Sequence, residues 1–401
     1  MPLDRPLNIL VLASFYKGER FLKQAHARGA KVYLLTQEKL LNKPWPRECL
    51  VDVFAQRDDS PLMHTISTVS YLARSIAFDR IVPMDDYDVE TAATLREHLR
   101  LPGMGDTTAR HFRDKLATRV KAREEGLPVP EFVHVLNHDA IREFTKRVPA
   151  PWMMKPRSEA SASGIVKCEN EKQLWDTIAE KDDRASYFIL EKYIPGDVYH
   201  ADSIISERKV VFTATHQCGT PPFNVAHGGG IFTTSTVERG SPDDLAMREL
   251  NEKVLTKMGL VRGVSHTEFI KSRENGKFYL LETAARVGGA HISDVIESAS
   301  GVNLWQEWAN IEFDKGEVPY VLPKERKEYA GVALTLAKQD EPDLSTYNDP
   351  EVVFRSPEKH HAGLIIRSPK YARVKELLES YQRRFATDFM AQLPSPTRPH
   401  V

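Results

Sequence analysis

Several features are scarce in this 401-residue sequence, and each scarcity argues against a class of protein. There are only three cysteines, Cys49, Cys168 and Cys218, far apart and without a CxxC pair. This argues against both a disulfide framework and a zinc site. No run of about 18 apolar residues occurs, and the first apolar run, 7–13, is too short for a signal sequence. We therefore expect a cytoplasmic protein with no membrane partner.

An excess of charge of either sign is also missing. Lys and Arg total 55, against 56 for Asp and Glu. A dedicated nucleic-acid binder usually shows a basic excess, so we expect no nucleic-acid partner, although local clusters can still hold an anionic ligand. No G-x-G-x-x-G follows the first strand-like run, which argues against a nicotinamide or flavin site.

The order of the elements predicts a mixed α/β and α+β chain of four segments. Residues 7–36 read as strand, helix and strand, and "FDRIVPMDDYDVETAATLREHLRL" repeats the strand-then-helix pattern, so 1–108 is expected to be an α/β domain. A glycine-rich joint, 103–105, leads into the second segment, 109–190. The third, 191–317, is rich in strands but carries a helix with Ser241 as N-cap and Gly259 as its stop. The fourth, 318–401, is again mixed.

The run "HTEFIKSRENGKFYLLET" predicts a hairpin that opposes two glutamates. Asn275-Gly276 between strand-like runs is a strong hairpin signal. A three-residue loop, 274–276, places Glu268 opposite Glu282 on one face; a two-residue loop would put them on opposite faces. Like charges directly opposed are unfavourable, and a cation such as Mg²⁺ would resolve the conflict. The alternative is a pair of solvated glutamates on an exposed strand.

A second candidate site follows the strand "WMMKP". Lys155 lies at the end of this strand, and a loop of small residues, 158–164, comes next. Such a loop can close over phosphates through its backbone N–H groups and hydroxyls. It is not a Walker A sequence, so a surface lysine before a turn is the alternative. Lys115, in the helix after the glycine-rich joint, carries no signal by itself.

Taken in order, these pieces resemble the ATP-grasp superfamily. The similar segments are "FRDKLATRVKAREEGLPVPEF", "WMMKP" with its small-residue loop, "FILEKYIPGDVYHADSII", "HTEF" and "LLETAAR". The resemblance implies an ATP-grasp fold in which 1–108 is the N-terminal domain and 109–190 the small nucleotide lobe. It makes 191–317 the catalytic lobe, extended by a C-terminal subdomain, 318–401. It also implies ATP as cosubstrate, with Mg²⁺ or Mn²⁺.

The resemblance also assigns roles to residues. Lys115, Lys155, Ser163 and Gly164 would contact ATP phosphates, while Glu191 and the backbone at Tyr193 and Ile194 would hold the adenine. Asp202 falls near the acidic nucleotide-site position that usually follows the Pro-Gly turn. Glu268 and Glu282 would bind the metal, and Arg286 would hold the acyl phosphate; Arg286 and Lys155 are the expected catalytic residues.

The sequence departs from the family at one position. The family usually has an asparagine two residues after the second metal glutamate, whereas this chain has Ala284. One metal ligand is therefore missing. This departure keeps open a protein that binds ATP but has weak or no ligase activity.

The residues after the arginine suggest the kind of substrate. Biotin carboxylases carry "RxQVEH" here, whereas this chain has "RVGGAHI", which disfavours bicarbonate. The run resembles carboxylate–amine ligases, in which Gly288 and Gly289 would admit a substrate carboxylate. His291 is a further pocket candidate, or a packed histidine at a helix start. His227, in "FNVAHGGGIFTT", is expected in a mobile loop over the substrate or in a long surface hairpin.

We therefore expect an ADP-forming ligase that joins a small-molecule carboxylate to an amine. A thiol or hydroxyl acceptor stays open as an alternative to the amine. A homodimer is also left open, because nothing in the sequence decides the oligomeric state.

Overall fold

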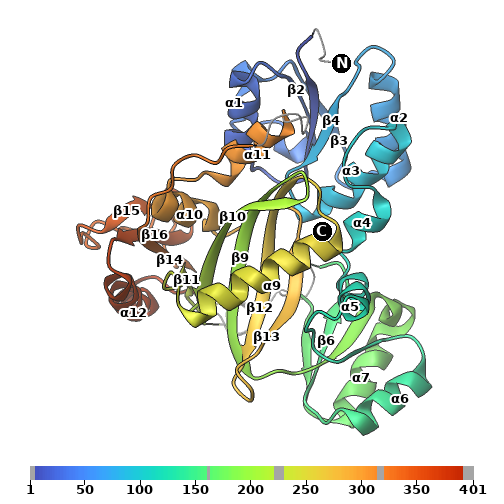
Figure 1. Ribbon diagram of the computed structural model, residues 1–401, viewed down its shortest axis with the longest axis vertical. Helices are drawn as coiled ribbons and strands as arrows, with labels where there is room; N and C mark the ends of the chain where they lie inside the picture. Colours follow the sequence, from blue (N-terminus) through green and yellow to red (C-terminus); the bar gives the residue numbers. More distant parts are fainter. Residues whose placement is uncertain (1–4, 160–162, 221–229, 314–319, 392–401) are drawn as a thin grey trace.

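The computed structural model describes residues 5–159, 163–220, 230–313 and 320–391. The described strands form one parallel and two antiparallel sheets, stacked from the N-terminal domain through a large central sheet to a small lobe (Figure 1). Among the helices of the described ranges, none combines the length and the apolar character needed to span a membrane.

The N-terminal domain is built on a parallel sheet with the order β3-β2-β1-β4. Every residue of the first strand is buried, and the first helix buries Phe21, Leu22 and Ala25, as its periodicity predicts. Its elements are β1 (Asn8–Ala13), α1 (Glu19–Ala27), β2 (Lys31–Gln37), β3 (Asp52–Gln56), α2 (Leu62–Leu72), β4 (Arg80–Pro83) and α3 (Asp86–Leu99).

A joint with α4 (Asp106–Arg110) and α5 (Lys115–Glu124) leads to the small lobe. The lobe is an antiparallel sheet with the order β5-β8-β6-β7 and two helices. Its elements are β5 (Phe132–His134), α6 (His138–Arg147), β6 (Trp152–Pro156), β7 (Val166–Cys168), α7 (Glu171–Lys181) and β8 (Phe188–Lys192).

The catalytic lobe is an eight-stranded antiparallel sheet with the order β13-β12-β9-β10-β11-β14-β16-β15. The residues after 318 form no sheet of their own within the described ranges, because their strands extend this one. The elements are β9 (Gly196–Ser206), β10 (Lys209–Cys218), β11 (Phe232–Thr236), α9 (Pro242–Met258), β12 (Gly263–Ser272), β13 (Phe278–Ala284), α10 (Ile292–Ser300), α11 (Leu304–Glu312), β14 (Tyr329–Leu336), β15 (Val352–Arg355), β16 (His361–Ser368) and α12 (Tyr371–Asp388).

The two faces of this sheet differ in chemistry. Helix α9 crosses one face diagonally (Figure 1) and shares an apolar core with Ala201 and Phe269. Its ends are as predicted: the Ser241 side chain accepts from the Asp244 N–H, and Gly259 closes the helix with φ 89°. Side chains alternate along a strand, so residues such as Asp202 and Glu268 lie on the other face.

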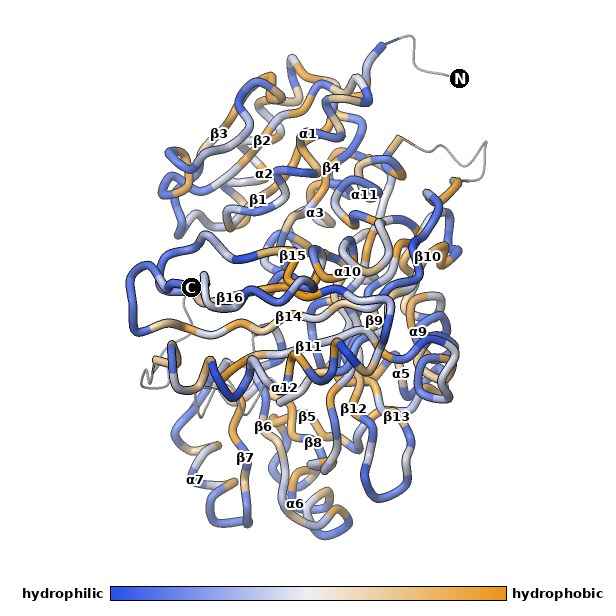
Figure 2. The backbone as a smooth tube through the Cα atoms, turned by 90° about the vertical axis from the view of Figure 1, so that its left-hand side faces the viewer, coloured by the Kyte–Doolittle hydropathy of each residue, from blue (hydrophilic) through white to orange (hydrophobic). Residues whose placement is uncertain are grey.

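One hydrophobic core joins the N-terminal domain to the catalytic lobe. Phe21 of α1 meets Trp308 of α11 edge to face, with ring centroids 5.5 Å apart, and Val264 of β12 belongs to the same cluster. Figure 2 shows the apolar strands of this region and the hydrophilic turn between β12 and β13. The shared core holds the N-terminal domain in a fixed position beside the catalytic sheet.

Candidate nucleotide and metal site

The structure pairs the two glutamates of the β12–β13 hairpin. Glu268 is in register with Glu282, as predicted, but the predicted three-residue loop is wrong. The Ser272 N–H donates to the Lys277 carbonyl at 2.9 Å, so the loop has four residues, 273–276. That loop alone would set Glu268 opposite Leu281. A β-bulge between Glu268 and Phe269 shifts the register by one and restores the glutamate pair.

The bulge gives Leu281 a specific polar partner. Its carbonyl oxygen accepts a hydrogen bond from Nη2 of Arg119 at 2.6 Å. Arg119 lies on α5 with its side chain fully buried, and its Nε is 2.7 Å from Oε1 of Glu191 on β8. One buried guanidinium thus ties the catalytic hairpin to the small lobe, and sequence reasoning did not identify it.

Glu191 is the anionic partner of two cations. Its second oxygen is 2.7 Å from Nζ of Lys155, and its side chain is 1% exposed. Burial acts to raise the pKa of Glu191, but the charges of Arg119 and Lys155 outweigh it and lower that pKa. In this structure the Glu191 side chain pairs with Arg119 and Lys155, and its expected contact with adenine stays a prediction.

One of the backbone N–H groups expected to contact the adenine already has a partner within the protein. The Tyr193 N–H donates to the Pro151 carbonyl at 3.2 Å, and Ile194 is buried. Lys167 lies over the Tyr193 ring, 4.6 Å from its centroid.

Lys115 is placed at the glutamate pair by the start of α5. The carboxylate of Asp114 accepts from the Leu116 and Ala117 N–H groups and caps the helix, so Lys115 is its first residue. Its Nζ lies 2.9 Å from Oε2 of Glu282 and donates to the Glu159 carbonyl at 2.8 Å. Burial opposes ionisation of Glu282, but Lys115 prevails and lowers its pKa to about 2.

Arg286 is held by a residue that the sequence did not single out. Its Nε and Nη2 both lie 2.7 Å from Oδ2 of Asp86, the first residue of α3. Asp85 caps the same helix and forms an ion pair with Lys17. Burial opposes the charge on Arg286, but Asp86 raises its pKa, so the guanidinium stays charged. The N-terminal domain therefore positions the arginine of the catalytic lobe.

Some of these groups line one small cavity. Asp86, Lys115 and Glu282 line it together with Glu159 and Ala284. It thus brings together the N-terminal domain, the joint helix, the small lobe and the catalytic hairpin.

The remaining predicted residues are placed as follows. Gly164 has φ 69° in the turn that leads into β7; Ser163 precedes it, whereas 160–162 lie outside the described residues. His291 is the N-cap of α10, with Nδ1 3.1 Å from Oδ2 of Asp294, and it packs against Phe354. His227 lies outside the described residues.

The two glycines after Arg286 differ in what surrounds them. A Cβ added to Gly289 would meet no atom within 4 Å. A Cβ on Gly288 would lie 3.0 Å from both Asp202 and His266. Gly288 therefore packs closely on these side chains, and its role beside a substrate stays a prediction.

Asp202 is fully buried, and its two oxygens accept hydrogen bonds from Nδ1 of His200 and Nδ1 of His266. Both oxygens face histidines in this structure, and the expected contact with nucleotide stays a prediction.

The glutamate pair fits a divalent cation. Two carboxylates are opposed on one strand pair, where like charges repel unless a cation lies between them. Carboxylate oxygens are the donors that Mg²⁺ and Mn²⁺ prefer. The methyl group of Ala284 offers no third oxygen.

The residues that sequence reasoning missed, Asp86, Arg119, His200 and His266, carry few local signals. Asp86 lies 200 positions from Arg286 in sequence. The two histidines had one signal: each precedes an acidic residue by two positions in a strand, in "HAD" and "HTE".

Comparisons with known proteins identify one matching domain and several relatives. The sequence profile of the ATP-grasp domain matches residues 120–292. The L-arginine-specific L-amino acid ligase of Bacillus subtilis is 27% identical over 241 residues, which span 58% of this chain and 57% of that protein. The chain therefore spans less than two thirds of that relative. A D-alanine–D-alanine ligase of Thermotoga petrophila is 27% identical over 218 residues, 51% of this chain and 68% of the ligase.

The solved structures show the same fold over nearly the whole chain. The crystal structure of an L-amino acid ligase from Bacillus licheniformis aligns with a TM-score of 0.72 and 17% identity, over 98% of this chain and 100% of that one. The expected ATP-grasp fold is confirmed. Residues 120–292 of this chain therefore match the ATP-grasp domain, and the fold around them is the ATP-grasp fold.

Proposed function

We propose that this protein is an ADP-forming ligase that activates a small-molecule carboxylate as an acyl phosphate and joins it to an amine. The observation that carries the proposal is the convergence of Lys115, the Glu268–Glu282 pair and Arg286 at the junction of three regions of the chain. Phosphoryl transfer needs positioning and charge stabilisation rather than covalent chemistry from the protein. Cations and metal-binding carboxylates at one point supply both.

Each residue has a role in this reaction. Lys115 and Lys155 bind phosphate oxygens, and Glu191 keeps Lys155 oriented. Glu268 and Glu282 would hold Mg²⁺ or Mn²⁺, which when bound offsets the negative charge of the nucleotide phosphates. Arg286 presents a planar fork to the acyl phosphate, and a fork can hold two oxygens where a lysine holds one.

The relatives support amino acids as the substrate class. The two curated relatives described above are named as an L-amino acid ligase and a D-alanine–D-alanine ligase. We infer that both substrates are amino acids or similar small molecules, with ATP as cosubstrate. A protein with weak activity remains the second candidate, because Ala284 supplies no oxygen to the metal.

A matrix of carboxylates and amines, assayed for ADP release with mass detection of the products, tests the proposal. The expected result is ADP release that requires both substrates, together with a product whose mass is their sum minus water. Release with a thiol or hydroxyl acceptor in place of the amine would contradict the C–N ligase. ATP binding without release for any pair would favour the second candidate.

A further inference from the structure

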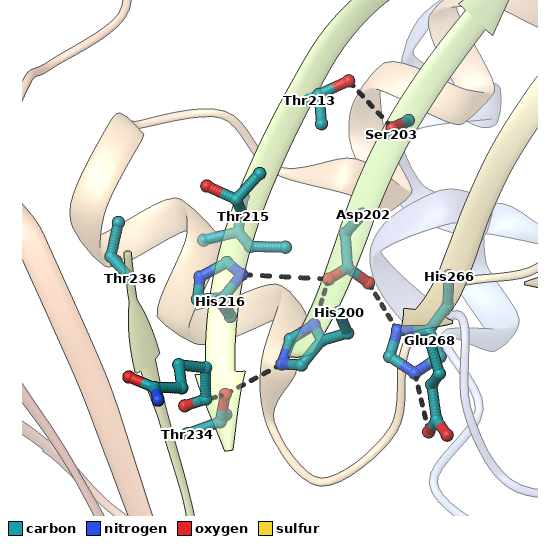
Figure 3. A network of polar contacts seen from close by, with 12 residues as sticks. His200, Asp202, Ser203, Thr213, Thr215, His216, Thr234, Thr236, His266 and Glu268 are labelled. Atoms are coloured by element: carbon teal, nitrogen blue, oxygen red, sulfur yellow. Dashed lines mark hydrogen bonds and ion pairs between the residues drawn. The ribbon is translucent and has the colours of Figure 1, made fainter. Parts of the chain in front are cut away.

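A buried polar network lies on the catalytic sheet beside the glutamate pair (Figure 3). On neighbouring strands, His216 is in register with His200, and His200 with Glu268. One row further along, Asp202 is in register with His266. All but Glu268 are almost completely buried.

Within this network, three side chains form a continuous chain toward the metal site. Nδ1 of His266 lies 2.8 Å from Oδ1 of Asp202, and Nε2 of the same ring lies 3.5 Å from Oε1 of Glu268. Nδ1 of His200 occupies the other oxygen of Asp202 at 2.6 Å. Both oxygens of Asp202 thus face imidazoles, with Nδ1 of His216 a further 3.9 Å from Oδ2, and the His266 ring lies between two carboxylates.

The surrounding backbone leaves just enough room for this arrangement. Ala284 is in register with His266 on β13, and its small side chain leaves space beside the imidazole. Gly288 packs on the other side, where a Cβ would lie 3.0 Å from both His266 Nδ1 and Asp202 Oδ1. At 3.0 Å, a Cβ at this position would require the ring or the Asp202 side chain to shift by a few tenths of an ångström. The glycine turn after Arg286 is thus coupled to the orientation of His266.

We propose that His266 and Asp202 are positioning residues that fix the carboxylate of Glu268 toward Glu282 for the nucleotide-bound metal. This inference rests on the proposed function, which makes Glu268 a metal ligand. An unrestrained Glu268 would swing away from Glu282, because the two carboxylates repel each other. The imidazole contact opposes that swing, and Asp202 holds the imidazole. Outer partners of this kind typically contribute about 10- to 100-fold to metal affinity.

The same cluster could instead be a binding site for a metal ion. His200, Asp202 and His266 offer ligand atoms within 4.8 Å of one another. Both Nδ1 atoms, however, lie at ordinary hydrogen-bond distance from separate oxygens of Asp202. An ion would have to displace both hydrogen bonds, so the geometry favours the positioning role.

The experiment measures Mn²⁺ affinity by electron paramagnetic resonance, in the presence of a non-hydrolysable ATP analogue. His266→Asn keeps an amide at the position of Nδ1, toward Asp202, but cannot reach Glu268. It should weaken Mn²⁺ binding about 10- to 100-fold and leave metal-free nucleotide affinity unchanged. His266→Gln, whose amide reaches the position of Nε2, should recover part of the loss.

His216→Ala is the matched control. His216 stacks on His200 with ring centroids 4.8 Å apart and is equally buried; its Nδ1 lies 3.9 Å from Oδ2 of Asp202, and within the described ranges it makes no contact with Glu268. Its removal should change Mn²⁺ affinity by less than about threefold, well under the range for an outer partner of a ligand. An equal loss in this control would show that any damage to the network suffices, and would overturn the specific role of His266.

A double-mutant cycle with Glu268→Gln separates positioning from direct ligation. If His266 acts through Glu268, adding His266→Asn to Glu268→Gln should cause little further loss of Mn²⁺ affinity. Additive losses would mean that His266 acts independently, and would overturn the proposal. A transition metal that survives chelation in the wild type and is lost in Asp202→Ala would overturn it in favour of an ion site.

The results that would reject the proposed ligase differ from those that would reject the positioning role. Absence of ADP release for every substrate pair, with the Mn²⁺ results as expected, would reject the ligase and leave the positioning role standing. Normal ligase activity with unchanged Mn²⁺ affinity in His266→Asn would reject the positioning role alone.

Discussion

Replacement of Glu191 by glutamine should sharply destabilise the small lobe. The carboxylate lies between two cations at 2.7 Å each, with Arg119 fully buried and Glu191 1% exposed. The amide keeps the shape but has one oxygen and one NH₂, so it must direct a donor at one cation. Removing one partner of a buried ion pair costs about 3–5 kcal/mol, because the remaining charge stays buried and unpaired.

Hydrogen–deuterium exchange of β6 and β8 measures this cost locally. Since about 1.4 kcal/mol corresponds to tenfold, exchange through local opening should accelerate about 100-fold to about 4,000-fold. Arg119→Met in the same chain should restore part of the protection, because it removes the charge left unpaired. The loss in the double variant should then be smaller than the sum of the single losses.

Glu125→Gln is the control for this prediction. Glu125 also contacts two lysines, Lys121 at 2.6 Å and Lys257 at 3.0 Å, but at the surface. Surface ion pairs contribute little, so exchange in β6 and β8 should stay at the wild-type rate. Less than tenfold acceleration in Glu191→Gln would refute the reasoning, since it would mean that water or a rearrangement compensates the buried cations.

Three further predictions concern the catalytic hairpin and its turn. Arg286→Lys should keep nucleotide affinity but lower the rate of ADP release about 100-fold. One ammonium group cannot contact both Asp86 and an acyl phosphate as the planar guanidinium can. Equal losses of nucleotide affinity and ADP release would make Arg286 a nucleotide or structural residue. Glu282 has a pKa lowered from 4.5 to about 2. The ionised carboxylate therefore stabilises the folded protein above pH 4.5, and this contribution is lost as the pH falls toward about 2. Thermal melts without metal should therefore show a shallower acid loss for Glu282→Gln, and parallel curves would contradict the Lys115 pairing. Gly288→Ala should lower the melting temperature while Gly289→Ala leaves it unchanged; equal melting temperatures would contradict the packing of Gly288.

The local elements could be predicted because their signals are local. Ser241 and Gly259 mark the ends of α9 through a side-chain cap and a left-handed backbone, and both signals act within a few residues. The glutamate pairing was also predictable, although for an incomplete reason. The four-residue loop and the bulge shift the register in opposite directions, so their effects cancel.

The contacts that join distant segments could not be predicted from one sequence. Asp86 meets Arg286 only because the shared core seats the N-terminal domain on α11, and no pattern in either segment encodes that packing. In the structure the carboxylate of Glu191 pairs with Arg119, a residue that sequence reasoning did not single out from the other charged residues of its helix. Burial and partner together decide such roles, and both are properties of the assembled chain.

Strand β14 covers one edge of β11 in the catalytic sheet, and this pairing decides where the chain can be cut. Strand β11 pairs with β10 on one side and with β14 on the other. A fragment that ends at residue 292, where the ATP-grasp match ends, would leave the outer edge of β11 with unpaired N–H and C=O groups. Such an edge is a template for pairing with another molecule. Exchange of this sheet between proteins of the same fold should therefore take residues 196–391 as one unit, because a shorter segment is expected to self-associate before it can be assayed.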